Sequence, residues 1–144
     1  MALSGFSVGR DVSLDIIDTS GNPLDFGLMT SFKSKKDQVD LKVKPIGGGT
    51  IHITIPDGYS GSFTYERKNG NADDYFCRMD DNYYAGRDQP TITFTETVQE
   101  PDGSISQYRY IGVVLSYADA GEWKGDATVK QVINWFASKK IKIQ

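Results

Sequence analysis

The sequence predicts a mainly β fold with one α-helix, arranged as a β-sandwich or barrel. Two observations lead to this fold class. Apolar and polar residues alternate through most of the chain, as they do in strands that bury one face. One segment, around residues 72–84, instead follows the helical period of 3.6 residues. Fifteen glycines also exceed the roughly ten of average usage, which favours many turns.

Nothing in the sequence divides the chain, so we expect a single domain over residues 1–144. It holds no repeat, no low-complexity segment and no linker. The first residues lack a basic stretch followed by a long apolar run, so no signal peptide is expected. No run approaches the roughly 18 apolar residues of a membrane span. A single cysteine, Cys77, fits a protein kept in a reducing cytoplasm.

Strands are expected first at residues 12–16, 28–36, 39–44, 50–55 and 60–68. The segment 50–55 alternates most clearly, because Ile51, Ile53 and Ile55 share one face and polar residues the other. The run 45–49, Pro-Ile-Gly-Gly-Gly, breaks the pattern and must be a loop. We therefore expect residues 28–55 to form an extended hairpin with the loop 45–49 at its tip.

The helix has recognisable ends. Asn71 is a suitable N-cap, acidic residues follow in the first turn, and Gly86 is suited to end the helix. One helical face carries Ala72, Phe76, Met79 and Tyr83.

Strands resume after the helix. Residues 91–98 place four threonines on one face, and residues 105–115 form a long return strand after the turn 100–104. The last stretch, 127–143, is apolar on both faces, which is typical of a strand buried on both. It is either central in its own sheet or covered by a neighbouring subunit, and both interpretations stay open.

Charge is unevenly distributed. The net charge is −3, which argues against nucleic-acid binding as the main task. Residues 33–44 carry a net charge of +3, whereas residues 66–102 carry −5. Such runs are either solvated faces or the two ends of a molecule that binds head to tail.

No catalytic or metal-binding group emerges. The one histidine, His52, lies on the polar face of a strand, and Cys77 is expected to be a small buried side chain. One Cys and one His cannot build a zinc site. The paired aspartates of the helix are interpreted as surface charge, and Gly47–Gly49 as a hairpin tip. We therefore expect no enzyme activity and no cofactor.

Many strands with one helix leave open sheet edges, which are a liability unless blunted or paired. Few prolines protect these strands. Pairing with another copy would satisfy the edges, and head-to-tail pairing closes a ring where the rotation permits. The sequence thus predicts self-assembly.

Three motifs resemble the tail tube proteins of contractile-tailed bacteriophages, and the resemblance covers roughly residues 10–143. The first is Ile55-Pro-Asp-Gly-Tyr-Ser-Gly-Ser-Phe63, and the second is Glu100-Pro-Asp-Gly-Ser104. The third is Gly121-Glu-Trp-Lys-Gly-Asp126, with Val129-Lys-Gln131 and Phe136-Ala-Ser138. The order of the elements is also similar.

The resemblance implies a structural virion protein. Strands of six copies would join into a continuous inner barrel, and the hexameric rings would stack into a hollow tube through which DNA passes. The implied partners are further copies, the sheath, tape-measure, baseplate and tail terminator proteins, and DNA in transit, with no membrane. The location would be the virion tail, and the host cytoplasm during assembly.

Two groups of residues are expected at contacts. Inter-ring or sheath contacts are expected at the basic hairpin and its tip, through Lys33, Lys35, Lys36, Lys42, Lys44, Gly47, Gly48 and Gly49. Contacts between subunits of a ring are expected in the last strand, through Val132, Trp135 and Phe136. A tube wall that does not hold DNA would expose the threonine ladder or carboxylates.

Three alternatives remain. A type VI secretion-like tube and a baseplate tube-initiator protein share the implied architecture, and fold alone cannot separate them. A monomeric carbohydrate-binding β-sandwich belongs to a different class, and it would have a clustered aromatic face.

Overall fold

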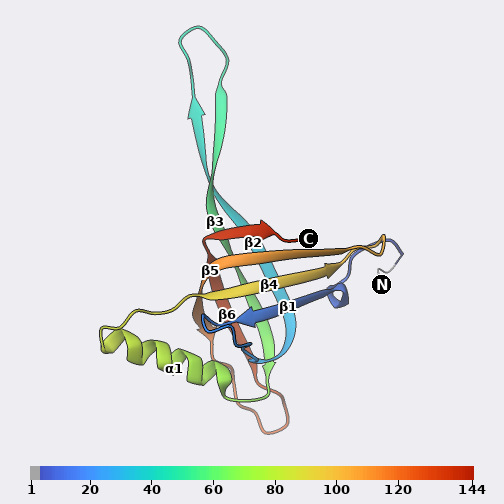
Figure 1. The fold of residues 1–144 in the computed structure, drawn as a ribbon, viewed down its shortest axis with the longest axis vertical. Coiled ribbons are helices and arrows are strands. Elements are labelled where there is room, and N and C mark those ends of the chain that lie inside the picture. Colours follow the sequence, from blue (N-terminus) through green and yellow to red (C-terminus); the bar gives the residue numbers. More distant parts are fainter. Residues whose placement is uncertain (1–3) are drawn as a thin grey trace.

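The computed structural model describes residues 4–144 (Figure 1). Residues 1–3, part of the segment where no signal peptide is expected, lie outside the described residues. The elements, in chain order, are a 3-10 turn Gly9–Asp11, β1 Val12–Ile17, β2 Gly27–Val43, β3 Ile51–Arg67, α1 Asn71–Tyr84, β4 Ile92–Gln99, β5 Ile105–Asp119, β6 Lys130–Ala137 and β7 Lys139–Lys142. The mainly β fold with a helix is confirmed.

The strands form an antiparallel sheet in the order β1-β4-β5-β6-β3-β2, with β7 also paired to β5. The long strand β5 belongs to two layers. Its residues 105–113 pair with β4, and its residues 114–119 pair with β6. One layer is therefore β1-β4-β5-β7 and the other is β5-β6-β3-β2, and their strands cross steeply in Figure 1.

The strands β2 and β3 run much further than the sequence predicts. Residues 28–36 and 39–44 were expected as separate strands, as were 50–55 and 60–68. The structure joins each pair into one strand of 17 residues. Shifts of register between Met29 and Ser31 and between Lys36 and Gln38 absorb the irregular residues, as β-bulges do.

The core lies between the two layers and is largely aromatic. Trp135 is fully buried, and its ring makes edge contacts with Phe94 and Tyr110 at centroid distances of 5.5 and 5.0 Å. Phe32 stacks on the same indole at 5.6 Å. Such pairs add about 0.5–1.5 kcal/mol each beyond their burial.

The strand β6 lies centrally, between β5 and β3. Its burial alternates although its sequence does not. Ile133, Trp135 and Ala137 are buried, whereas Val132 is half-buried and Phe136 is 54% exposed. Burial on both faces is therefore wrong for the single chain, because only one face meets the second layer.

The helix α1 begins one residue before the expected range. Gly70 takes the cap position, and the Asn71 N–H bonds to Oδ1 of Asn69 at 3.0 Å, so the prediction of an Asn71 cap is wrong. The end at Gly86 is confirmed, since this glycine has φ +71° and its N–H bonds to the Tyr83 carbonyl.

Candidate functional site

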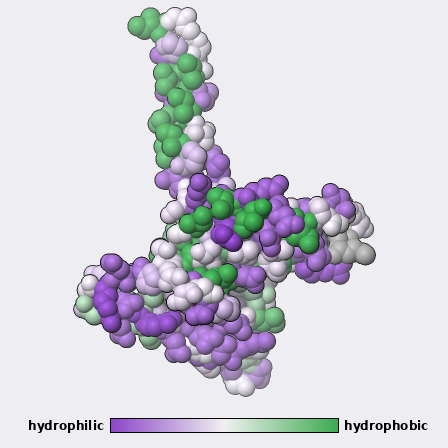
Figure 2. Space-filling model, viewed as in Figure 1, coloured by the Kyte–Doolittle hydropathy of each residue, from purple (hydrophilic) through white to green (hydrophobic). Residues whose placement is uncertain are grey.

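The distal part of the β2–β3 pair stands out from the rest of the molecule (Figure 1). We call residues 38–56 the projecting hairpin. Its pairs Val39–Ile55, Leu41–Ile53 and Val43–Ile51 lie on one face. All six side chains are 43–51% exposed, and Figure 2 shows them as a hydrophobic strip along the hairpin. A strip of this kind marks an interaction surface.

The opposite face of the projecting hairpin is polar. Thr54 donates a hydrogen bond to the Asp40 carboxylate at 3.3 Å, and Lys42 pairs with His52 across the strands. The two faces thus differ completely in chemistry, and only the apolar one gains from leaving water.

The hairpin leaves the body at a defined neck. The register shifts between Lys36 and Gln38, and Gly58 has φ +89°. A Cβ at Gly58 would lie 2.5 Å from the Ala137 carbonyl oxygen, so the backbone of β6 approaches too closely for a side chain. The neck therefore sets the direction of the hairpin.

The sheet has an open edge along β2. Within residues 4–144, β2 pairs with β3 alone, so its other side offers free backbone groups. A cleft of about 610 Å³ separates this edge from β1, and Leu14, Met29 and Phe32 are among its lining residues. Glu96 also lines it and accepts a hydrogen bond from the Tyr110 hydroxyl at 2.9 Å.

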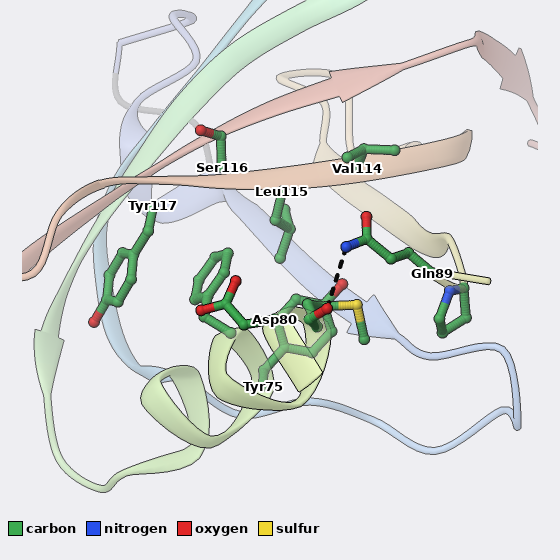
Figure 3. Close-up of a pocket in the computed structure, with 10 residues that line it drawn as sticks. Tyr75, Asp80, Gln89, Val114, Leu115, Ser116 and Tyr117 are labelled. Atoms are coloured by element: carbon green, nitrogen blue, oxygen red, sulfur yellow. Dashed lines mark hydrogen bonds between the residues drawn. The ribbon is translucent and has the colours of Figure 1, made fainter. Parts of the chain in front are cut away.

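A second open edge lies on β5, in the same four-strand layer. Residues 114–119 pair with β6 on one side, and no described strand pairs on the other. There a cleft of about 360 Å³ separates β5 from α1 (Figure 3). Leu115 points into this cleft toward the helix, and Gln89 donates a hydrogen bond to the Met79 carbonyl at its rim, at 3.2 Å.

The helix is held beside this edge by a polar network. The Tyr117 hydroxyl donates to Asp73 at 2.7 Å, and Arg67 donates two bonds to the same carboxylate at 3.3 and 3.2 Å. Phe76 stacks on the Tyr117 ring at 4.4 Å. Burial, then the bond to Asp73, raises the pKa of Tyr117, so it stays a neutral donor.

The strand β7 is held by a lysine among tyrosines. The Lys140 ammonium lies 4.4 Å from the ring centre of Tyr108, 5.3 Å from Tyr110 and 5.6 Å from Tyr59. These contacts fix β7 to the core from within the chain.

These surfaces suit association of chains. No cluster of three potential metal ligands occurs among residues 4–144. His52 is exposed on the hairpin. Cys77 is exposed, so the expectation that it is buried is wrong, because it lies on the outward side of α1. No described helix is long and apolar enough to cross a membrane.

Comparison with known proteins gives a match at the level of structure. No family model and no curated protein matches the sequence. The sheath-tube complex of an extracellular contractile injection system, PVC, contains a chain that superposes with a TM-score of 0.64 at 9% identity, covering 90% of this chain and 87% of that one. The baseplate of the anti-feeding prophage gives 0.60 at 7% identity, covering 98% and 97%. The SPP1 tail tube gives 0.59 at 18% identity, covering 94% and 78%.

The chain has the tail-tube fold. At these identities the likeness concerns the fold, and it agrees with the resemblance drawn from the turn motifs. In this tail-tube fold the projecting hairpin and the two open edges are the features that a single chain leaves unsatisfied.

Four of the five predicted lysines are divided between two surfaces of the tail-tube fold, whereas Lys36 pairs with Tyr59 on the face toward the second layer. Lys33 and Lys35 pair with Ser62 and Ser60 on the uncovered face of the four-strand layer. Lys42 lies on the polar face of the projecting hairpin, with Lys44 just beyond its strand. The glycines 47–49 form the hairpin tip beside the fully exposed Ile46. The apolar strip between these groups was missed, although its alternation is visible in the sequence.

The three residues predicted at a subunit contact also separate. Trp135 is buried inside the chain, so its ring is not available to another copy. Phe136 and Val132 lie on the uncovered face, opposite Ser60 and Thr64. A role between subunits stays a prediction for these two.

Proposed function

We propose that this chain is a structural tail-tube subunit that assembles into stacked rings around a hollow channel. The observation that carries the proposal is the pair of open edges on one layer of a tail-tube fold. An exposed edge is a template for pairing with another chain unless it is blunted or covered.

Ring closure would join the β2 edge of one copy to residues 114–119 of β5 in the next. The four described strands of the layer alternate in direction, so β2 runs opposite to β5. The new pair is therefore antiparallel, like every other pair in the layer. A head-to-tail contact of this kind repeats identically around a ring. We propose six copies, because a structure with this fold was determined with six-fold symmetry.

The geometry of such a ring decides which face lines the channel. Twenty-four strands spaced about 4.8 Å apart close at a radius of about 18 Å before tilting. A second layer packed about 10 Å inside would have less than half that circumference. That is too short for the four strands that each copy contributes to the second layer. The layer β1-β4-β5-β7 must therefore lie outside, and with it the threonine ladder of β4.

The channel wall is then the uncovered face of β5, β6, β3 and β2. Besides the apolar Leu28, Val114, Val132 and Phe136, it carries small polar side chains, three lysines and two acids. These are Ser31, Ser60, Ser62, Thr64, Ser116 and Asn134, with Lys33, Lys35, Lys130, Glu66 and Asp119. The three lysines and two acids leave a net charge of only +1 per copy, so the wall holds a passing polyanion weakly, which suits the transit of DNA.

Stacking of the rings would use the projecting hairpin. Its apolar strip remains in water until it lies against a neighbouring ring, and burial at about 25 cal/mol per Å² makes that contact favourable. The lysines 42 and 44 would lie at the border of the same contact, or at a sheath.

The proposed partners follow from this role. They are other copies of the chain, a sheath, a terminator and a baseplate, and structures with this fold come from complexes of those kinds. We add a tape-measure protein during assembly. The proposed location is the virion tail, preceded by the host cytoplasm. No enzymatic step is proposed.

A tube-initiating role at a baseplate is the second candidate, because one similar structure is part of a baseplate. The two roles differ in the number of stacked rings that the purified protein forms. A tube subunit forms tubes of many rings by itself, whereas an initiator stops at one or two.

Negative-stain electron microscopy of the purified protein tests the proposal. Stacked rings with a central hole are the expected result. Single rings at high protein concentration would favour the initiator. Dispersed monomers at high concentration would overturn both assignments and favour a monomeric β-sandwich.

A further inference from the structure

The end of the molecule opposite the projecting hairpin carries an exposed tryptophan. Trp123 lies in the loop between β5 and β6, and its side chain is 70% exposed. Figure 1 places this loop and the hairpin at opposite ends of the molecule. A large aromatic ring left in water at one end of an assembling subunit requires an explanation.

Trp123 is held in position by the network that fixes α1. The Arg67 guanidinium lies 5.1 Å from the centre of the indole ring. Arg67 is itself fixed by Asp73, at 3.2 Å. One side of the ring therefore meets a fixed cation, which prepares the indole for binding at little entropic cost.

The first turn of the loop is also fixed. The Gln131 amide donates to the Ala120 carbonyl at 2.9 Å, and the Gly121 N–H donates to Asp119 at 2.8 Å. Gly121 has φ +95°, and a Cβ there would lie 2.4 Å from Val129. The chain packs too tightly at this point to accept any other residue.

Trp123 lies at the end of the molecule that the projecting hairpin of a stacked neighbour would reach. The pair Gly27–Arg67 closes one end of the β2–β3 ribbon, and the pair Val43–Ile51 closes the other. Copies that follow one another along the ribbon axis therefore bring the hairpin of one to the Arg67 end of the next. The apolar strip then meets the indole.

The charges of the two ends agree with this contact. Residues 119–126 hold Asp119, Glu122 and Asp126 against Lys124, a net charge of −2. Residues 40–44 of the hairpin hold Lys42 and Lys44 against Asp40, a net charge of +1. Opposite charge around an apolar centre fixes orientation more than it adds affinity.

We propose that Trp123 is the anchor that receives the projecting hairpin of the next copy along the tube. This inference rests on the proposed function, and it adds the receptor for the hairpin. A tryptophan beside an arginine, at the centre of an apolar contact, has the composition of a binding hot spot.

Quenching of tryptophan fluorescence by acrylamide tests the anchor in the wild-type protein. The chain has two tryptophans, and Trp135 is already buried. Quenching of the free subunit therefore reports on Trp123. We expect the Stern–Volmer slope to fall several-fold when tubes form. Tubes in which the slope is unchanged would overturn the inference while leaving the proposed function intact.

Two substitutions complete the test. Trp123→Ala should leave the unfolding midpoint nearly unchanged and rings visible in micrographs, but tubes should require at least a tenfold higher protein concentration. Tyr84→Ala, at the 84%-exposed end of α1, is the matched control and should form tubes like wild type. Wild-type-like tubes from Trp123→Ala would contradict the anchor. Failure of wild type to form any ring would instead contradict the proposed function.

Discussion

The two halves of the β2–β3 ribbon carry similar side chains and have opposite surroundings. In the lower half, Phe32 and Phe63 point into the core, and Phe63 is 1% exposed. In the upper half, Leu41 and Ile53 form the same kind of cross-strand pair, and both stay in water. The ribbon is continuous, so strand formation alone does not bury an apolar face. The second layer of the fold does so, and above the neck no described residue supplies one.

This difference separates the residues that fold the chain from those that we propose assemble it. Substitutions in the lower half should act on the unfolding of the single subunit. Substitutions in the upper half should act on association and leave unfolding almost unchanged, because the hairpin is already exposed in the free chain. Four predictions test that separation.

The largest effect is expected from a charge in the apolar strip. Ile53→Asp should abolish tubes, because the carboxylate would have to be buried at the contact. The thermal unfolding midpoint should stay within a few degrees of wild type. His52→Asp places the same charge on the polar face, one residue away, and should still form tubes in micrographs. Equal loss in both variants would mean that the strip is not the contact.

The next effect concerns the core below the neck. Trp135→Ala should lower the free energy of unfolding by about 3–5 kcal/mol in a denaturant titration, since the indole is fully buried. Its neighbour Phe136 is 54% exposed on the face that would line the channel, so Phe136→Ala should change that free energy little and leave ring formation nearly unchanged. A sizing column that shows Phe136→Ala failing to form rings would instead place Phe136 at a contact between subunits, as the sequence predicts.

A smaller effect distinguishes two glycines of the ribbon. A Cβ at Gly61 would lie 1.9 Å from the Lys33 carbonyl oxygen and 2.9 Å from the Trp135 ring. Gly61→Ala should therefore cost about 1–3 kcal/mol of unfolding free energy. Gly47, at the hairpin tip, has nothing within 4 Å, so Gly47→Ala should be neutral in the same titration. A neutral Gly61→Ala would show that β2 can move away from β3.

The smallest effect is expected from the hairpin lysines. Exposed ion pairs contribute about 0.2–1 kcal/mol, so Lys42→Glu with Lys44→Glu should raise the protein concentration needed for tubes only a few-fold. The effect should shrink as salt screens the charges. Lys139→Glu with Lys142→Glu makes the same charge change on β7, outside residues 38–56. Tubes of the hairpin variant with normal length and normal salt resistance would exclude these lysines from the contact.

The sequence predicted the local elements well and the burial of particular residues less well. The loop 45–49, the alternation of Ile51, Ile53 and Ile55, and the helix end at Gly86 follow from turn chemistry and periodicity, which are local. Trp135 and Phe136 are adjacent and equally apolar, so only the position of the second layer decides which one is buried. The open edges of β2 and β5 depend on strand order, which no short-range pattern contains.

The missed surfaces have a similar cause. The apolar strip looks like the buried face of an ordinary strand until the structure places nothing over it. Trp123 becomes meaningful only when Arg67, 56 positions earlier in the chain, lies beside it and is held there by Asp73.

The projecting hairpin also has a consequence for the protein before it is assembled. Residues 51–55 form a short segment of high β-propensity with no proline and no acidic or basic charge other than His52, which is the composition of aggregation-prone strands. A cell that makes many free subunits holds this strip in solution at high concentration. Lys42, Lys44 and Asp40 beside it have the character of gatekeepers that delay wrong pairing. If the chain builds the proposed tube, the supply of new subunits would have to stay matched to the number of growing tube ends, because surplus subunits would expose this strip to one another.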